Sequence, residues 1–129
     1  MKSLVISALM ILAAFAGTTM GQTEKRITFA KGKSSAVVKG NTGQHGSYYV
    51  VRAKQGQMLT LDVSPVARVG VKVETNGRYG HSVLLHEEHG GRFEIGLEEA
   101  GDYTIFIGSL NGKPVPITMT VSIRKLADI

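Results

Sequence analysis

The segment from residue 81 to residue 89 holds the densest group of side chains able to bind a metal. They are His81, His86, Glu87, Glu88 and His89. The order His-Glu-Glu-His is one residue short of the His-Glu-x-x-His pattern, which places two imidazoles on one face of a helix around zinc. On a strand, an offset of three sends His86 and His89 to opposite faces, and the glycines that follow indicate a turn. We therefore expect a solvated hairpin tip, and neither a metal nor another cofactor.

Three carboxylates, those of Glu98, Glu99 and Asp102, are close enough in sequence to suggest general acid and base catalysis. They lie, however, in a turn that leads into a strand, where adjacent carboxylates usually serve solubility. The chain also lacks cysteine, a glycine-flanked serine nucleophile and a glycine-rich loop that opens a helix. We therefore expect a protein that is not an enzyme.

Two loops contain the residue types that recognise a partner. The first runs from Asn76 to Gly80, where glycines bracket Arg78 and Tyr79, and Arg and Tyr are frequent interface anchors. The second runs from Gly108 to Pro114 between the last two strands. The candidate binding residues in the two loops are Asn76, Arg78, Tyr79, Ser109, Asn111 and Lys113. The alternative for each loop is a plain hairpin turn.

Residues 1–21 have the layout of a secretory signal peptide, with Lys2 ahead of an apolar segment from Leu4 to Phe15 and small residues beyond. The apolar segment is shorter than the roughly 20 residues of a membrane-spanning helix, so we expect cleavage and no permanent span. We place the cleavage after Gly21, which leaves residues 22–129 as one domain. Without cysteine, this domain must fold on packing alone, in the periplasm or outside the cell.

The mature segment alternates apolar and polar residues along nearly its whole length, which predicts an all-β domain. Glycine and asparagine turns separate the alternating runs at short, regular intervals. The expected strands are 26–30, 35–40, 47–54, 57–64, 69–75, 81–86, 91–97, 102–108 and 116–124. About nine short strands fit a single antiparallel β-sandwich of jelly-roll type, with Leu61, Val73, Ile95 and Val121 in its core.

The charge of the chain favours an acidic partner. It has 15 Lys and Arg against 10 Asp and Glu, and the cations are scattered. No run of basic and aromatic residues suggests nucleic-acid binding. A positive field attracts a carboxylate-lined cleft or an anionic envelope polymer. Tyr48 and Tyr49 are consecutive on an expected strand, so one of them must face outward and is available for binding.

Several segments of the chain resemble the periplasmic inhibitors of g-type lysozyme. They are Phe29-Ala30-Lys31-Gly32-Lys33-Ser34-Ser35-Ala36, Gly40, Tyr49, Ala53-Lys54-Gln55-Gly56-Gln57, Gly91, Phe93 and Gly101-Asp102-Tyr103. The chain is more distantly similar to bacterial pre-peptidase C-terminal domains, which share the Ala-x-x-Gly-Gln turn and the Gly-Asp-Tyr strand start.

The resemblance implies a small antiparallel β-sandwich, export to the periplasm and insertion of loop side chains into the lysozyme cleft. The inhibitors carry a longer, basic, Asn-containing connection between the last two strands, whereas this chain has only Ser109 to Pro116. We expect a non-catalytic inhibitor of a cell-wall lytic enzyme such as a lysozyme. The alternative is an accessory module that binds an envelope polymer or another protein through Tyr48 or Tyr49 on a sheet face.

Overall fold

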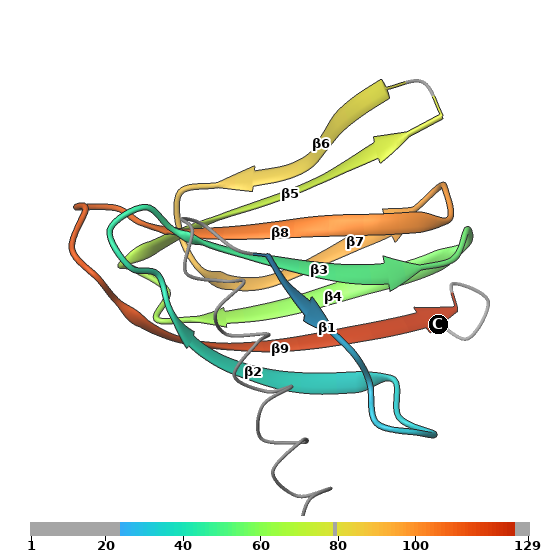
Figure 1. Ribbon diagram of the computed structural model, residues 1–129, viewed down its shortest axis with the longest axis horizontal. Coiled ribbons are helices and arrows are strands. Elements are labelled where there is room, and N and C mark those ends of the chain that lie inside the picture. The colour runs from blue at the N-terminus through green and yellow to red at the C-terminus, as the bar shows by residue number, and fades with distance from the viewer. Residues whose placement is uncertain (1–23, 79, 126–129) are drawn as a thin grey trace, which may run out of the picture.

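The computed structural model describes residues 24–78 and 80–125, which form strands and turns without a helix (Figure 1). The strands are β1 (Glu24–Ile27), β2 (Ser35–Asn41), β3 (Ser47–Ala53), β4 (Gln57–Ser64), β5 (Val69–Gly77), β6 (Gly80–Glu87), β7 (Gly91–Leu97), β8 (Gly101–Ser109) and β9 (Pro116–Lys125). All nine expected strands are present within a few residues of their expected bounds. The expected signal peptide lies outside the described residues.

The strands form two sheets that pack face to face as a sandwich. One sheet has the order β1-β3-β8-β5-β6 and the other the order β2-β9-β4-β7. The inward side chains of β5 and β9 are buried while the alternate ones are partly exposed, because successive side chains of a strand point to opposite faces. The four predicted core residues, Leu61, Val73, Ile95 and Val121, are all buried in one cluster. The expected β-sandwich is therefore confirmed.

Most connections of the described chain cross from one sheet to the other. Among the described strands, only β5 and β6 are both consecutive and in the same sheet. The expected hairpin tip after His86 is therefore wrong, because β6 and β7 belong to different sheets. The same holds for the plain hairpin considered at Gly108 to Pro114, because β8 and β9 also belong to different sheets. Alternation within a strand does not reveal which of two sheets the strand joins.

The first strand differs most from expectation. It spans Glu24–Ile27 instead of 26–30, and it pairs parallel with β3, whereas the other paired strands are antiparallel. The parallel pairing arises because β2 lies in the opposite sheet between β1 and β3 in sequence. In the described part of the chain, nothing forms a helix of the length and apolarity that a membrane crossing requires.

Candidate functional site

The two predicted recognition loops lie at opposite ends of the sandwich (Figure 1). The register pairs Val69 with Ser109 and Thr75 with Tyr103, so Asn76 lies level with the start of β8 while Ser109 lies at its end. We call the end with the β2–β3, β4–β5, β6–β7 and β8–β9 connections the β8–β9 end, and the other the β5–β6 end. The structure therefore separates Asn76 and Arg78 from the candidates in the β8–β9 connection.

The side chain of Asn111 organises the β8–β9 connection. Its Oδ1 accepts hydrogen bonds from the Ser109 hydroxyl at 2.9 Å and from the Lys113 backbone N–H at 3.0 Å. Asparagine side chains stabilise turns in this way because they substitute for a backbone acceptor. Ser109 and Asn111 thus shape the loop, and Lys113 is an exposed cation within it.

Thr42 joins the β2–β3 connection to the β8–β9 connection. Its backbone N–H donates to the Val115 carbonyl at 2.9 Å, and its Oγ1 accepts the Val115 N–H at 3.0 Å. Thr42 and Val115 are each 1% exposed. A buried pair of hydrogen bonds therefore sets where the base of the β8–β9 connection lies.

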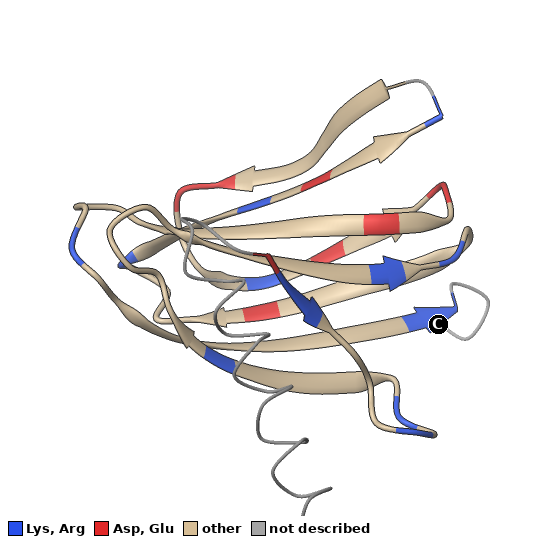
Figure 2. Ribbon diagram, in the orientation of Figure 1, with Lys and Arg blue, Asp and Glu red and all other residues tan. Residues whose placement is uncertain are grey.

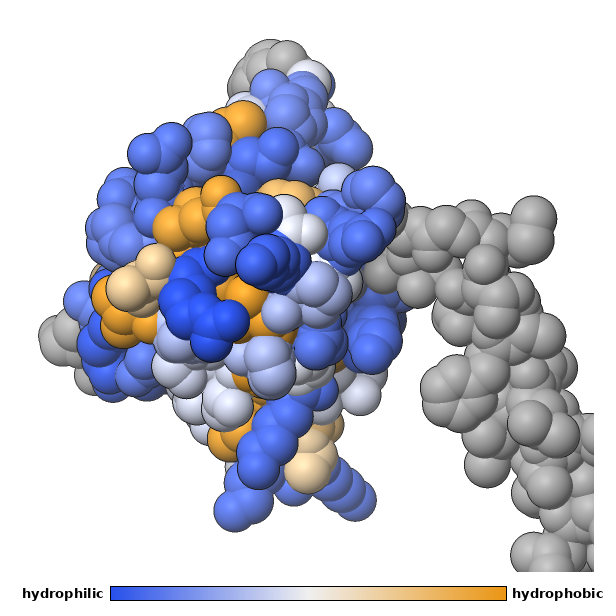
Figure 3. All heavy atoms as spheres, turned by 90° about the vertical axis from the view of Figure 1, so that its left-hand side faces the viewer, coloured by the Kyte–Doolittle hydropathy of each residue, from blue (hydrophilic) through white to orange (hydrophobic). Residues whose placement is uncertain are grey.

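The β4–β5 connection completes this end of the sandwich. The Leu110 N–H donates to the Arg68 carbonyl at 3.2 Å, and the Gly90 N–H donates to the Val66 carbonyl at 2.7 Å. Val66 and Leu110 are exposed apolar side chains of this end, at 53% and 52%. Figure 3 faces this end and shows apolar side chains among hydrophilic ones. Apolar groups beside an Arg have the composition of an interface core.

Two cations of the β8–β9 end are available to a partner. Neither Arg68 nor Lys113 forms an ion pair within the described residues. Two acidic residues lie where β6 meets the β6–β7 connection. Glu87 Oε1 lies 3.2 Å from His89 Nε2, and Glu88 is the first residue of the connection. Val66, Arg68 and Leu110 are not among the binding residues predicted from the sequence. The available signal was an apolar residue within each of two turn-rich segments.

At the β5–β6 end, Glu99 ties two turns together. Its Oε1 accepts the Arg78 backbone N–H at 2.9 Å, and its carbonyl accepts the Tyr103 hydroxyl. Gly77 leaves room for this carboxylate, since an added Cβ would lie 1.9 Å from Glu99 Oε2. Arg78 therefore shares its surroundings with a carboxylate. Tyr79, the other candidate anchor of this loop, lies outside the described residues.

Another member of the acidic trio, Asp102, forms ion pairs with arginine. Arg26 Nη1 and Nη2 donate to its two carboxylate oxygens at 3.1 and 2.9 Å, and Arg52 Nη1 lies 3.7 Å away. The hydrogen bonds from Arg26 lower the pKa of Asp102 below its ordinary value. Glu99 and Asp102 thus hold strands and turns together, which gives them a structural role.

The histidines do not converge on one point. His81 Nε2 lies 2.8 Å from Glu74 Oε2, and His89 pairs with Glu87. Across residues 24–78 and 80–125, no group of three or more His, Asp or Glu side chains is placed to hold a metal ion. These histidines therefore form separate pairs on the surface.

The outer face of the five-stranded sheet carries an aromatic pair. Tyr48 and Phe106 face outward with ring centroids 4.9 Å apart. Tyr48 borders an open hollow of about 520 Å3, whose lining also includes Arg26, Val50 and Glu74. Tyr49 is only 1% exposed, and burial raises its pKa above the ordinary value. Of the two tyrosines expected to serve a sheet-face site, Tyr48 alone is accessible, and the suggestion of Tyr49 is wrong.

Solved structures of other proteins share the fold of this domain. No protein-family model matches the sequence, and no curated protein matches it. A periplasmic inhibitor of g-type lysozyme from Aeromonas hydrophila superposes with a TM-score of 0.69 at 27% identity, over 79% of this chain and 96% of that one. A mutant of the Escherichia coli inhibitor gives 0.62 at 20% identity, over 81% and 100%. A pre-peptidase C-terminal domain of a Bacillus anthracis collagenase gives 0.47 at 11% identity, over 82% and 99%.

The β-sandwich described above is thus shared with periplasmic inhibitors of g-type lysozyme, and the resemblance seen in the sequence is confirmed. These neighbours are inhibitors of g-type lysozyme, in agreement with the expected non-catalytic character of the chain.

Proposed function

We propose that the protein is an exported inhibitor of a g-type lysozyme or a related lytic enzyme, and that its β8–β9 end enters the enzyme cleft. The observation that carries this proposal is the superposition on the Aeromonas hydrophila inhibitor over nearly the whole length of that protein. Export follows from the signal-peptide layout of residues 1–21, with residues 22–129 as the mature domain.

The β8–β9 end has the chemistry needed to block a glycosidase cleft. Glycosidases use Asp or Glu side chains to act on the glycosidic bond. Lys113 and Arg68 supply unpaired cations, and Val66 and Leu110 supply apolar surface that gains free energy when it leaves water. A cation that meets a carboxylate in a desolvated cleft contributes through charge complementarity.

The loop is also held in one shape before binding. Asn111 closes the turn around Lys113, and Thr42 fixes Val115 at its base. A preorganised loop loses less conformational entropy on association, so more of its contact energy appears as affinity. This rigidity compensates for the shortness of the connection compared with the longer one of the inhibitors that the chain resembles.

The β5–β6 end is the less suitable of the two. Arg78 lies in a hollow that is also lined by Glu98 and Glu99, and the Glu99 carboxylate binds the Arg78 backbone. Two carboxylates beside the cation weaken its attraction to a further carboxylate of an enzyme. We therefore assign the contact with the enzyme to Lys113 and Arg68.

A lysis assay with a g-type lysozyme tests the proposal. The protein, purified after export, is titrated into the enzyme, and clearing of a cell-wall suspension is followed. We expect complete inhibition at roughly nanomolar concentration. A lysozyme of a different type serves as the specificity control. Full lytic activity at micromolar protein would contradict the proposal. The mass of the exported protein tests the cleavage site, and a mass other than that of residues 22–129 would contradict cleavage after Gly21.

A second candidate function is binding of an envelope polymer, favoured by Tyr48, which lines an open hollow and lies beside Phe106 on the same sheet face. Aromatic rings on an exposed sheet provide flat apolar surface for a ligand chain. Co-sedimentation with purified cell walls tests this role. Binding that is lost in Tyr48→Ala but retained in Lys113→Ala would support it, whereas absence of binding would exclude it.

A further inference from the structure

A second hollow opens at the β5–β6 end, opposite the loops to which we assign inhibition. Its volume is about 460 Å3, which lies in the range of small-molecule sites. The lining residues are Phe29, Lys33, Ser34, Arg52, Ala53, Lys54, Gln57, Ala100 and Ile123. They come from the β1–β2, β3–β4 and β7–β8 connections and the adjoining strands.

The inner part of this hollow is apolar. Ala53 and Ile123 belong to the buried core, and Phe29 packs against that core from the β1–β2 connection. The space exists partly because Ala53 and Ala100 have small side chains. An apolar body placed here would lose contact with water on the side that faces the core.

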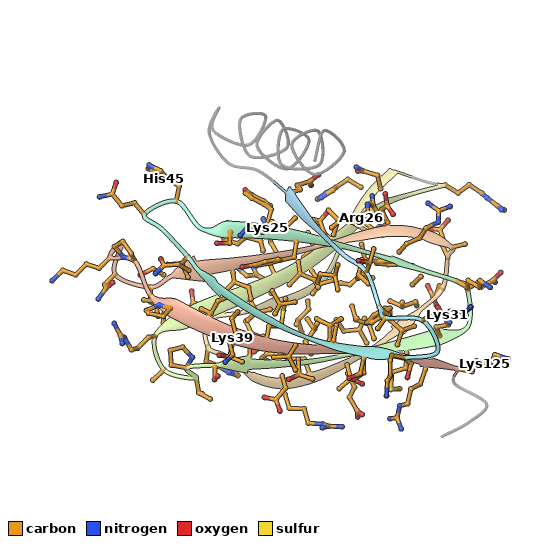
Figure 4. All side chains as sticks on the ribbon, turned by 60° about the horizontal axis from the view of Figure 1, so that its bottom comes forward. Lys25, Arg26, Lys31, Lys39, His45 and Lys125 are labelled. Carbon is orange, nitrogen blue, oxygen red and sulfur yellow. The ribbon has the colours of Figure 1, made fainter. Side chains whose placement is uncertain are left out.

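The rim of the hollow is positively charged. Lys33, Arg52 and Lys54 line it, and no carboxylate does. Within the described ranges, Lys33 and Lys54 form no ion pair. Arg52 approaches Asp102 only to 3.7 Å, and both oxygens of that carboxylate already accept hydrogen bonds from Arg26. Figure 2 shows Lys and Arg positions on several strand ends and connections at this end, and Figure 4 places Lys31 and Lys125 there too.

Backbone groups around the rim are already bonded. The Lys33 N–H donates to the Ala30 carbonyl at 2.8 Å, and the Lys54 N–H donates to Gln57 Oε1 at 2.7 Å. The Ile123 N–H likewise donates to the Ser34 carbonyl at 2.9 Å. A small inorganic anion would therefore find only flexible side chains in place of a backbone cradle. A positively charged rim and an apolar interior together fit a ligand that has an anionic group and an apolar body.

We propose that this hollow binds an amphipathic carboxylate, with its alkyl body against Phe29 and Ile123 and its carboxylate paired with Lys33 and Lys54. The site is separate from the proposed inhibitory end. It gives the protein a ligand that does not compete with the lytic enzyme.

Decanoate is the probe for the test, and binding is followed by amide chemical shifts of the exported protein. We expect a Kd below about 1 mM, with shifts confined to the connections that line the hollow. Acetate, which has only the head group, and decyltrimethylammonium, which has the opposite charge, should each bind at least about tenfold more weakly. Equal binding of decanoate and decyltrimethylammonium, or shifts centred elsewhere, would overturn the proposal.

Two charge-matched double variants distinguish a specific contribution of the rim lysines from an effect of net charge. Lys33→Ala/Lys54→Ala should weaken decanoate binding by about tenfold or more, while Lys39→Ala/Arg92→Ala, with the same loss of charge on β2 and β7 away from the hollow, should stay within about twofold. Ala100→Leu should block the hollow with the fold retained. An equal loss in both double variants would show that net charge alone attracts the ligand, and would overturn the site.

Two further controls complete the experiment. Lysozyme inhibition by Lys33→Ala/Lys54→Ala should be unchanged, so the failure of one proposal is distinguishable from the failure of the other. A chain that ends at Lys125 should bind decanoate within about twofold of the full chain. A tenfold or greater gain in affinity for decanoate would indicate that residues 126–129 occupy the hollow in the full chain. That result would overturn the proposal of an external ligand.

Discussion

Thr42 and Val115 exchange two hydrogen bonds, at 2.9 and 3.0 Å, across the base of the β8–β9 end. These residues belong to connections that are far apart in sequence and that both cross between the sheets. Their contact holds the β8–β9 connection against the β2–β3 connection, and so sets where Lys113 is presented.

Replacement of Thr42 by valine preserves its shape and removes the acceptor of the Val115 N–H. We expect a loss of about 1–3 kcal/mol in the free energy of unfolding, because a buried donor is left without a partner. Urea denaturation measures this loss. Thr120→Val on the outer sheet face is the control and should cost no more than about 0.5 kcal/mol. Equal stability of the two variants would contradict the role of Thr42.

Gly40 leaves the space that the Tyr49 hydroxyl occupies. An added Cβ would lie 2.4 Å from Tyr49 Oη. Gly40→Ala should therefore destabilise the fold by about 1–3 kcal/mol, since a buried ring cannot move freely. Combination with Tyr49→Phe removes the clashing oxygen, so the double variant should recover part of the loss. Strict additivity in thermal unfolding would show that this contact is not the cause.

Burial raises the pKa of both Tyr49 and Tyr103 above the ordinary value. The unfolded chain releases these protons near pH 10, whereas the folded protein retains them. Stability is therefore complete below about pH 10 and falls as the pH rises toward the folded pKa values. Urea unfolding at several alkaline pH values should show this fall. Tyr49→Phe should make it shallower, and an unchanged slope would argue against a buried tyrosine hydroxyl.

The ion pair of Arg26 and Asp102 anchors the edge strand β1. Its groups are exposed, so Asp102→Asn should change global stability by no more than about 0.5 kcal/mol. Amide hydrogen exchange reports local opening and is the sensitive measurement. Exchange in Glu24–Ile27 should become faster in Asp102→Asn while exchange in β9 stays the same.

Because Arg26 lowers the pKa of Asp102, the contribution of the pair is present above about pH 4 and is lost as the pH falls through the folded pKa. Unchanged exchange in β1 would contradict this anchoring role.

The strands of this domain were predictable from the sequence, and their connections were not. Alternation located all nine strands and the core positions Leu61, Val73, Ile95 and Val121, because one face of each strand is buried. Alternation cannot tell which of two sheets a strand joins. The sequence therefore predicts a hairpin tip at His86 to Gly90, where the chain in fact crosses from one sheet to the other. Chain order likewise hides that the loops around Arg78 and Lys113 point in opposite directions.

The candidate site was predictable only in part. Asn111 and Lys113 stand out in a turn-rich segment, but the turn geometry makes Asn111 a structural residue and leaves Lys113 as the presented cation. Arg68 and Val66 come from a connection that carries no distinctive motif. Their relevance follows from the backbone hydrogen bond that brings Arg68 beside Leu110, which is a tertiary contact.

The inhibition constant of two charge-matched double variants against a g-type lysozyme tests the central claim most directly. Arg68→Ala/Lys113→Ala removes the cations of the β8–β9 end, and Arg78→Ala/Arg124→Ala removes two cations from the opposite end. Both should fold, because exposed substitutions change stability by no more than about 0.5 kcal/mol each. We predict that the first double variant loses about 2 kcal/mol or more of binding free energy, roughly a thirtyfold rise in the inhibition constant, and that the second stays near the unmodified protein. A loss confined to the second variant, or inhibition unaffected by either, would contradict insertion of the β8–β9 end.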